Sequence, residues 1–138
     1  MDRKETIDRI ITFVNNIKGF DDRTVRPLLE IAVPPQVAKL FITDEALLDE
    51  DKRPFAADVG MLTHDGLFVG ITVYEKTIEA LEWHVNRLQE ISHEFREDFY
   101  DVSFSLSGLG QKYYLRARKS RWNELSEFVE ALREARRG

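Results

Sequence analysis

Residues 74–95 read YEKTIEALEWHVNRLQEISHEF, and the fold depends on how this stretch and the few residues up to Phe99 are interpreted. Apolar side chains recur in it at spacings of three and four residues, which places them on one stripe of an α-helix. The stripe consists of Ile78, Leu81, Val85, Leu88, Ile91 and Phe95. We therefore expect an amphipathic helix over residues 75–97 that packs on a sheet.

Length and composition restrict the class of protein. The chain has 138 residues, of which 43% are hydrophobic and 33% charged, as in a single globular domain. It has no cysteine, which excludes disulfides, thiolate zinc sites and cysteine nucleophiles. No apolar run approaches the roughly 20 residues needed to cross a bilayer. The N-terminal sequence MDRKETIDRI lacks the apolar core of a secretory signal, so we expect a cytoplasmic protein without membrane contacts.

Residues 1–50 are expected to form an N-terminal helical segment. Isoleucine and valine recur at helical spacing over residues 6–18, and Gly19 follows as a left-handed stop. A second helix is expected to begin nearer Thr24 than Asp21, because Pro27 is tolerated only in a first turn. A third is expected over residues 35–42, and the charged stretch 49–54 then forms a linker to a sheet domain at 55–138.

After this linker the hydrophobic period changes to two, which indicates strands. Asp65-Gly66 favours a hairpin. A three-residue loop with Gly66 in the left-handed region pairs Met61 with Val69 and Val59 with Ile71, and keeps Asp58 off the apolar face. We prefer this register to that of a two-residue loop.

On the opposite face, this register predicts what we call the glycine strip. Glycine in a strand often marks the close approach of another backbone or a ligand. We expect the helices of residues 1–50 to cover the strip, with a second subunit or a small ligand as alternative occupants. On the polar face of the expected helix, Trp83 has Arg87 one turn later to stack on it. The strip comprises Gly60, Leu62, Phe68, Gly70, Thr72 and Tyr74.

A second hairpin follows, over residues 100–117. Alternate residues from Tyr100 to Leu106 are apolar, and the return strand points Tyr113, Leu115 and Ala117 inward. A type II′ turn with Gly108 first aligns Phe104 with Tyr113. Residues 120–137 complete the chain as an amphipathic helix.

The fold class we predict is α+β. N-terminal helices are followed by a ββαββα unit, which forms a four-stranded antiparallel sheet with two helices on one face.

No motif in the chain predicts catalysis, and we expect no enzyme, no metal site and no cofactor. His84 and His93 lie nine residues apart, which on a helix points them to opposite sides. His93 with Glu97 lacks the second histidine of a zinc-protease helix. The function we expect is that of a noncatalytic binding, adaptor or regulatory module acting through protein–protein contacts, as a homodimer or with a protein partner. Its expected interface is the glycine strip together with Trp83 and Arg87.

The alternative is single-stranded nucleic-acid binding through a basic face on the last strand and its exit. Basic residues interleaved with an aromatic ring on a sheet suit phosphates and a stacked base. The net charge of −5 weighs against this alternative. The basic face comprises Lys112, Tyr114, Arg116, Arg118, Lys119 and Arg121.

If the basic face binds single strands, affinity falls with salt and is lost when Arg116 and Arg118 are both replaced by alanine, because phosphate contacts release counterions. An electrophoretic shift with single-stranded RNA and DNA at low salt measures this. No shift by the wild-type chain would end the alternative.

Overall fold

The computed structural model describes residues 1–43, 47–48, 54–106 and 112–137. Within them, helices α1 (Arg3–Val14) and α2 (Asp22–Ala32) precede strands β1 (Lys39–Ile42), β2 (Leu47–Leu48), β3 (Pro54–Leu62), β4 (Leu67–Tyr74) and β5 (Ile78–His84). A 3-10 turn, η1 (Val85–Arg87), leads to β6 (Leu88–Phe95), β7 (Phe99–Leu106) and β8 (Lys112–Arg118). A second turn, η2 (Lys119–Arg121), leads to α3 (Trp122–Arg137). The protein is α+β with antiparallel sheets, as predicted.

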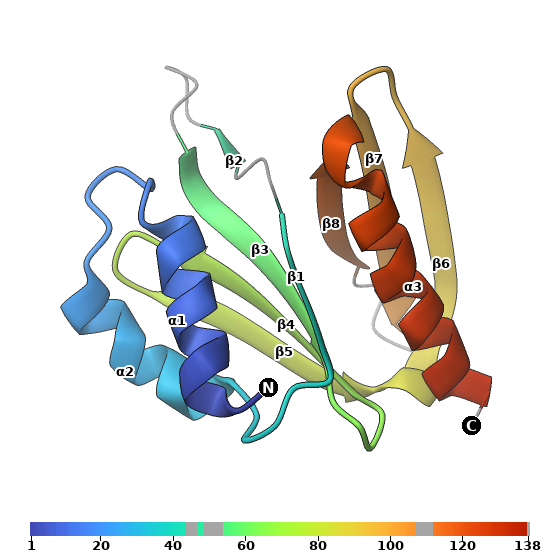
Figure 1. Ribbon diagram of the computed structural model, residues 1–138, viewed down its shortest axis with the longest axis horizontal. Helices are drawn as coiled ribbons and strands as arrows, with labels where there is room; N and C mark the ends of the chain where they lie inside the picture. The colour runs from blue at the N-terminus through green and yellow to red at the C-terminus, as the bar shows by residue number, and fades with distance from the viewer. Residues whose placement is uncertain (44–46, 49–53, 107–111, 138) are drawn as a thin grey trace.

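The described strands form two sheets, where a single four-stranded sheet was expected. The N-terminal sheet has the order β1-β3-β4-β5, with β2 also paired to β3, and the C-terminal sheet has the order β6-β7-β8. Figure 1 shows α1 and α2 on one side of the N-terminal sheet, with the C-terminal sheet and α3 on the other. In the part of the chain that the structure describes, the expected ββαββα arrangement with both helices on one face is absent. None of the helices described is long and apolar enough to cross a membrane.

The prediction of a helix over residues 75–97 is wrong, because this stretch forms β5, η1 and β6. The apparent stripe is not one surface: Val85 and Leu88 are buried, whereas Leu81 is 39% and Phe95 63% exposed. β5 pairs with β4 over Leu67–Val73, and β6 pairs with β7. A helix here would satisfy its own backbone but leave those edges of β4 and β7 unpaired. Since the side chains of β4 are buried on both faces, the cost of buried, unpaired backbone groups favours strands.

The expected helix over residues 35–42 is also wrong, because Lys39–Ile42 forms β1 and pairs with β3. Phe41 is buried in one core, and Ile42 in the other. A short apolar run does not distinguish helix from strand by period alone, and pairing to β3 decides it. Residues 1–50 are therefore not a separate helical segment. The predicted linker at 49–54 lies outside the described residues except for Pro54.

Helix α1 buries the predicted stripe of isoleucine and valine, but it spans Arg3–Val14 instead of residues 6–18 and is capped by Asn15 in the right-handed region. Gly19 has the expected positive φ of 75°, but it lies in the turn after the helix and is not its stop. Helix α2 begins at Asp22, earlier than predicted, because the side chain of Asp21 accepts a hydrogen bond from the Thr24 N–H and caps the helix. Pro27 therefore lies inside the helix, beyond its first turn.

Both predicted hairpin registers are confirmed. Val59 lies opposite Ile71 and Met61 opposite Val69, with Gly66 at φ 86°. In the second hairpin, Phe104 lies opposite Tyr113. The predicted turn at Gly108 lies outside the described residues.

Two hydrophobic cores lie on opposite faces of the N-terminal sheet. One is formed by α1 and α2 against Val59, Met61, Val69 and Ile71. The other joins Phe41 and Phe68 to the inner face of the C-terminal sheet and to α3. The sheet is thus the middle layer of the molecule, and its strands β3 and β4 are buried on both faces.

Tyr113 of β8 joins the two sheets. A methyl group built on Gly70 would lie 2.9 Å from the Tyr113 ring, so the ring occupies the space that any other residue would fill. The Tyr113 hydroxyl accepts a hydrogen bond from the Val59 N–H (3.1 Å) and reaches the carbonyls of Val59 and Ile71 (2.9 Å each). It has one proton, so it donates to one carbonyl at a time. Burial raises the pKa of Tyr113 well above its usual value, and Asp58 adds to this effect.

Replacing Tyr113 with phenylalanine should destabilise the fold by about 1–3 kcal/mol, because it removes the partner of buried backbone groups while keeping the ring over Gly70. The matched control is Tyr114→Phe on the same strand. Tyr114 is 56% exposed, so this change should alter stability by no more than about 0.5 kcal/mol. Urea denaturation of both variants measures the difference, and equal midpoints would contradict the assigned role of the hydroxyl.

Candidate functional site

Most of the predicted glycine strip is buried inside the chain. Leu62, Phe68, Gly60 and Gly70 lie on the N-terminal sheet in the expected rows. Their cover comes from β8 and α3, since a methyl group on Gly60 would meet Leu115 and Phe128. Residues 1–50, the expected cover, supply Phe41 to this core, but α1 and α2 lie on the opposite face. The close approach inferred from the glycines is real, and its source is the C-terminal half of the chain.

Trp83 and Arg87, expected one turn apart on a helix, do not stack, because this stretch forms strand β5 and the turn η1. Trp83 lies on β5 opposite Phe68, with ring centroids 4.7 Å apart, and is 9% exposed. Arg87 ends η1 and is exposed. The indole is therefore covered by Phe68 and by Tyr113, at 6.3 Å.

The predicted basic face carries acids as well. Register places Glu94, Asp101 and Arg116 in one row across β6, β7 and β8. The Arg116 guanidinium donates to both carboxylate oxygens of Asp101, at 2.6 and 3.1 Å. A second row contains Glu90 and Lys112. These carboxylates weigh against a phosphate-binding face, and nucleic-acid binding stays an untested prediction.

Arg121, grouped with that face in the sequence, lies elsewhere. Its guanidinium donates to both carboxylate oxygens of Glu124 (2.7 and 2.8 Å) and to the Ile42 carbonyl (2.9 Å). It also lies 4.7 Å from the centre of the Phe41 ring and 5.2 Å from that of Phe13. Arg121 therefore ties the start of α3 to β1 and α1.

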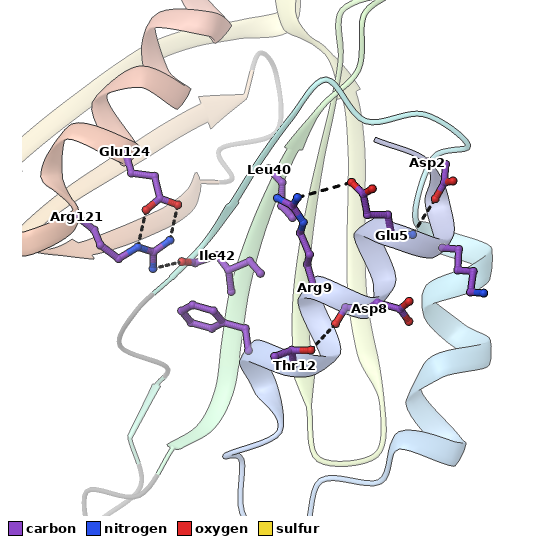
Figure 2. A pocket seen from close by; sticks show the side chains of 11 residues that line it. Asp2, Glu5, Asp8, Arg9, Thr12, Leu40, Ile42, Arg121 and Glu124 are labelled. Atoms are coloured by element: carbon purple, nitrogen blue, oxygen red, sulfur yellow. Dashed lines mark hydrogen bonds and ion pairs between the residues drawn. The ribbon is translucent and has the colours of Figure 1, made fainter.

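A groove of about 600 Å³ opens beside this contact, and we call it the β1 groove. Figure 2 shows α1 along one side, Leu40 and Ile42 of β1 between, and Arg121 with Glu124 at the start of α3 on the other side. Phe13, 37% exposed, adds an apolar surface. The remaining lining is charged or polar, from the outer face of α1: Asp2, Lys4, Glu5, Asp8, Arg9 and Thr12.

Many charged groups of the β1 groove are already engaged. Arg9 lies 3.7 Å from Glu5, and Arg26 of α2 reaches Asp8 at 2.9 Å. Asp2 caps α1 by accepting from the Glu5 N–H. Such pairs position the rim without adding much stability. Phe13 and the partly exposed Leu40 are then the apolar surface that a partner can desolvate, whereas Ile42 beside them is already buried.

A smaller cleft of about 450 Å³ lies at the open end of the glycine strip. Asp58, Thr72 and Glu79 form one row across β3, β4 and β5, with Lys112 and Tyr114 of β8 also lining the cleft. The Thr72 hydroxyl donates to Asp58 at 2.7 Å. Burial raises the pKa of Asp58, and Glu79 raises it further. The sequence could have located this row, since the predicted register already placed Asp58 opposite Thr72.

His93 joins β6 to α3. Arg133 can only donate, so its contact with His93 Nε2 (2.9 Å) requires that nitrogen to be unprotonated, and Nδ1 contacts the Tyr100 hydroxyl at 2.7 Å. Burial and Arg133 both lower the pKa of His93. Among the described residues, no group of three or more histidine and acidic side chains is arranged to hold a metal ion.

Sequence reasoning missed the β1 groove because its floor belongs to a stretch predicted as helix. Leu40 and Ile42 belong to no recognisable motif, and one phenylalanine outside the apolar stripe of α1, Phe13, is too weak a signal to indicate a site. The pairing of β1 with β3 creates the floor, and no local pattern encodes it.

Replacing Asp58 with asparagine should stabilise the fold near neutral pH, because burial disfavours the charged carboxyl. The folded pKa lies above the unfolded value of 3.8, so the carboxyl favours folding below pH 3.8 and loses this contribution as the pH rises through its folded pKa. The gain of the variant should therefore shrink in acid.

Denaturation curves against pH measure this gain. The control is Asp65→Asn, since a hydrogen bond from Thr63 lowers the pKa of Asp65. That change should cost stability above pH 3.8, with the opposite sign. An Asp58→Asn variant less stable than wild type at neutral pH would contradict the burial argument.

Comparisons with protein-family models, with curated proteins and with solved structures give no match to this chain.

Proposed function

We propose that this protein is a noncatalytic binding module that holds a partner protein in the β1 groove. The observation that carries the proposal is the combination of an apolar floor, formed by Phe13, Leu40 and Ile42, with a rim of charged side chains. Burial of apolar surface drives association, and a polar rim is the usual border of a protein interface.

The charges of the groove fit a protein partner rather than a polyanion. The lining holds four carboxylates and three cationic groups, so no strong field of one sign attracts phosphate. Because the rim charges are largely paired within the chain, they can confer orientation and specificity while the floor supplies affinity.

A matched pair of variants tests the groove. Phe13 on α1 is 37% exposed and lines it, whereas Ile31 on α2 is 84% exposed and does not. Peptides selected against the full chain from a displayed random library should bind at least about tenfold more weakly to Phe13→Asp. The same peptides should bind Ile31→Asp with unchanged affinity. Fluorescence anisotropy measures both, with circular dichroism to verify the fold.

Loss of binding in Ile31→Asp alone would place the partner on α2 and overturn the proposal.

A second copy of the chain is the other occupant that the sequence suggests. Light scattering of the wild type and of Phe13→Asp distinguishes it, since a homodimer through the groove would become monomeric in the variant. The homodimer expected from the sequence stays a prediction until then.

A further inference from the structure

The outer edge of β1 faces the β1 groove with its backbone hydrogen-bonding groups. The Thr43 N–H donates to the Asp58 carbonyl at 2.9 Å, which fixes the residues that pair with β3. The backbone N–H and C=O groups of successive residues point to alternate sides of an antiparallel strand. The backbone groups of Phe41, like those of Thr43, therefore point toward β3, and those of Leu40 and Ile42 point away from it. The bond from Arg121 to the Ile42 carbonyl confirms that this side is the outer one.

Three of these four outward groups have no hydrogen-bond partner in the part of the chain that the structure describes. They are the N–H and C=O of Leu40 and the N–H of Ile42. Ile42 as a whole residue is only 6% exposed, and a backbone N–H that loses its contact with water is costly without a partner. An open strand edge is a template for another strand.

We propose that the partner enters the β1 groove as an extended segment that pairs with β1 as an additional strand. This inference rests on the proposed function and specifies its mode, strand addition. The partner's carbonyls accept from the N–H groups of Leu40 and Ile42, and one of its N–H groups donates to the Leu40 carbonyl. Since β1 has four residues and a strand rises about 3.3 Å per residue, the paired length is about 13 Å.

The groove also defines the chemistry of that segment. Side chains alternate across a strand, so one set faces Phe13 and the apolar side chains of β1. Arg121 already occupies the Ile42 carbonyl and so marks where pairing ends. The partner is therefore a short extended peptide of low net charge with apolar side chains at alternate positions.

Leu40→Pro tests the pairing directly. It removes an N–H that points into the groove and plays no part in pairing with β3, and proline is tolerated on such an edge. The control Leu40→Val keeps the N–H and an apolar side chain. A selected peptide whose binding is sensitive to Phe13→Asp should bind Leu40→Pro at least about tenfold more weakly, and Leu40→Val nearly as well as wild type.

Two further readouts leave the protein unchanged. On peptide binding, amide exchange of Leu40 and Ile42 should slow, while that of Phe41, already bonded to β3, should stay as it was. Of two peptide versions that are N-methylated at alternate positions, only the one methylated on the set facing β1 should lose binding.

If peptides require Phe13 but ignore Leu40→Pro, both N-methylated versions bind, and Leu40 exchange is unchanged, strand addition is wrong while the proposed function stands. If no selected peptide is sensitive to Phe13→Asp, the proposed function and this mode both fail.

Discussion

The fold depends on the contact between Tyr113 and the strand pair β3–β4. The ring lies on Gly70, and the hydroxyl bonds to the backbone of Val59 and Ile71. A side chain of the C-terminal sheet thereby forms hydrogen bonds with the backbone of the N-terminal sheet. Two sheets that pack only through apolar side chains do not form such bonds. The contact determines how closely the two sheets approach, and Gly70 is required because a methyl group there would displace the ring.

The β1 groove follows from that approach. Once β8 lies over the N-terminal sheet, the chain leaving it through η2 brings Arg121 to β1, where it bonds to Ile42 and packs on Phe41 and Phe13. Helix α3 then begins on one side of β1 and α1 lies on the other. Within the described residues, no strand pairs with the outer edge of β1 between these helices, and the Arg121 guanidinium caps its Ile42 carbonyl. An edge strand between two helices offers backbone groups, an apolar floor and charged walls together, which is why we assign binding to this place.

The cleft at Asp58 lies on the same face of the N-terminal sheet as the glycine strip. Asp58, Thr72 and Glu79 continue the rows that carry Gly60 and Gly70, and Lys112, Tyr113 and Tyr114 of β8 line the same cleft. The Asp58 carboxyl there is partly buried, which raises its pKa, and perturbed groups of this kind are common at functional sites. The described part of the chain offers no second feature that would identify a ligand for this cleft, whereas the β1 groove has a backbone edge that no described residue pairs with.

By itself, the sequence determined the α+β class, the apolar stripe of helix α1, the positive φ of Gly19, the two hairpin registers and the close approach over Gly60 and Gly70. These features are local, since alternation, turn residues and glycine act within a few residues of one another. Tertiary structure alone decided that residues 78–95 form β5, η1 and β6, that residues 39–42 are a strand, and that the hairpins belong to different sheets. The physical reason is that EALEWHVNRLQEISHEF suits a helix locally, but β4 and β7 each have an edge to satisfy, and only distant pairing removes that cost. The candidate site depends on the same kind of pairing, so it could not be located without the fold.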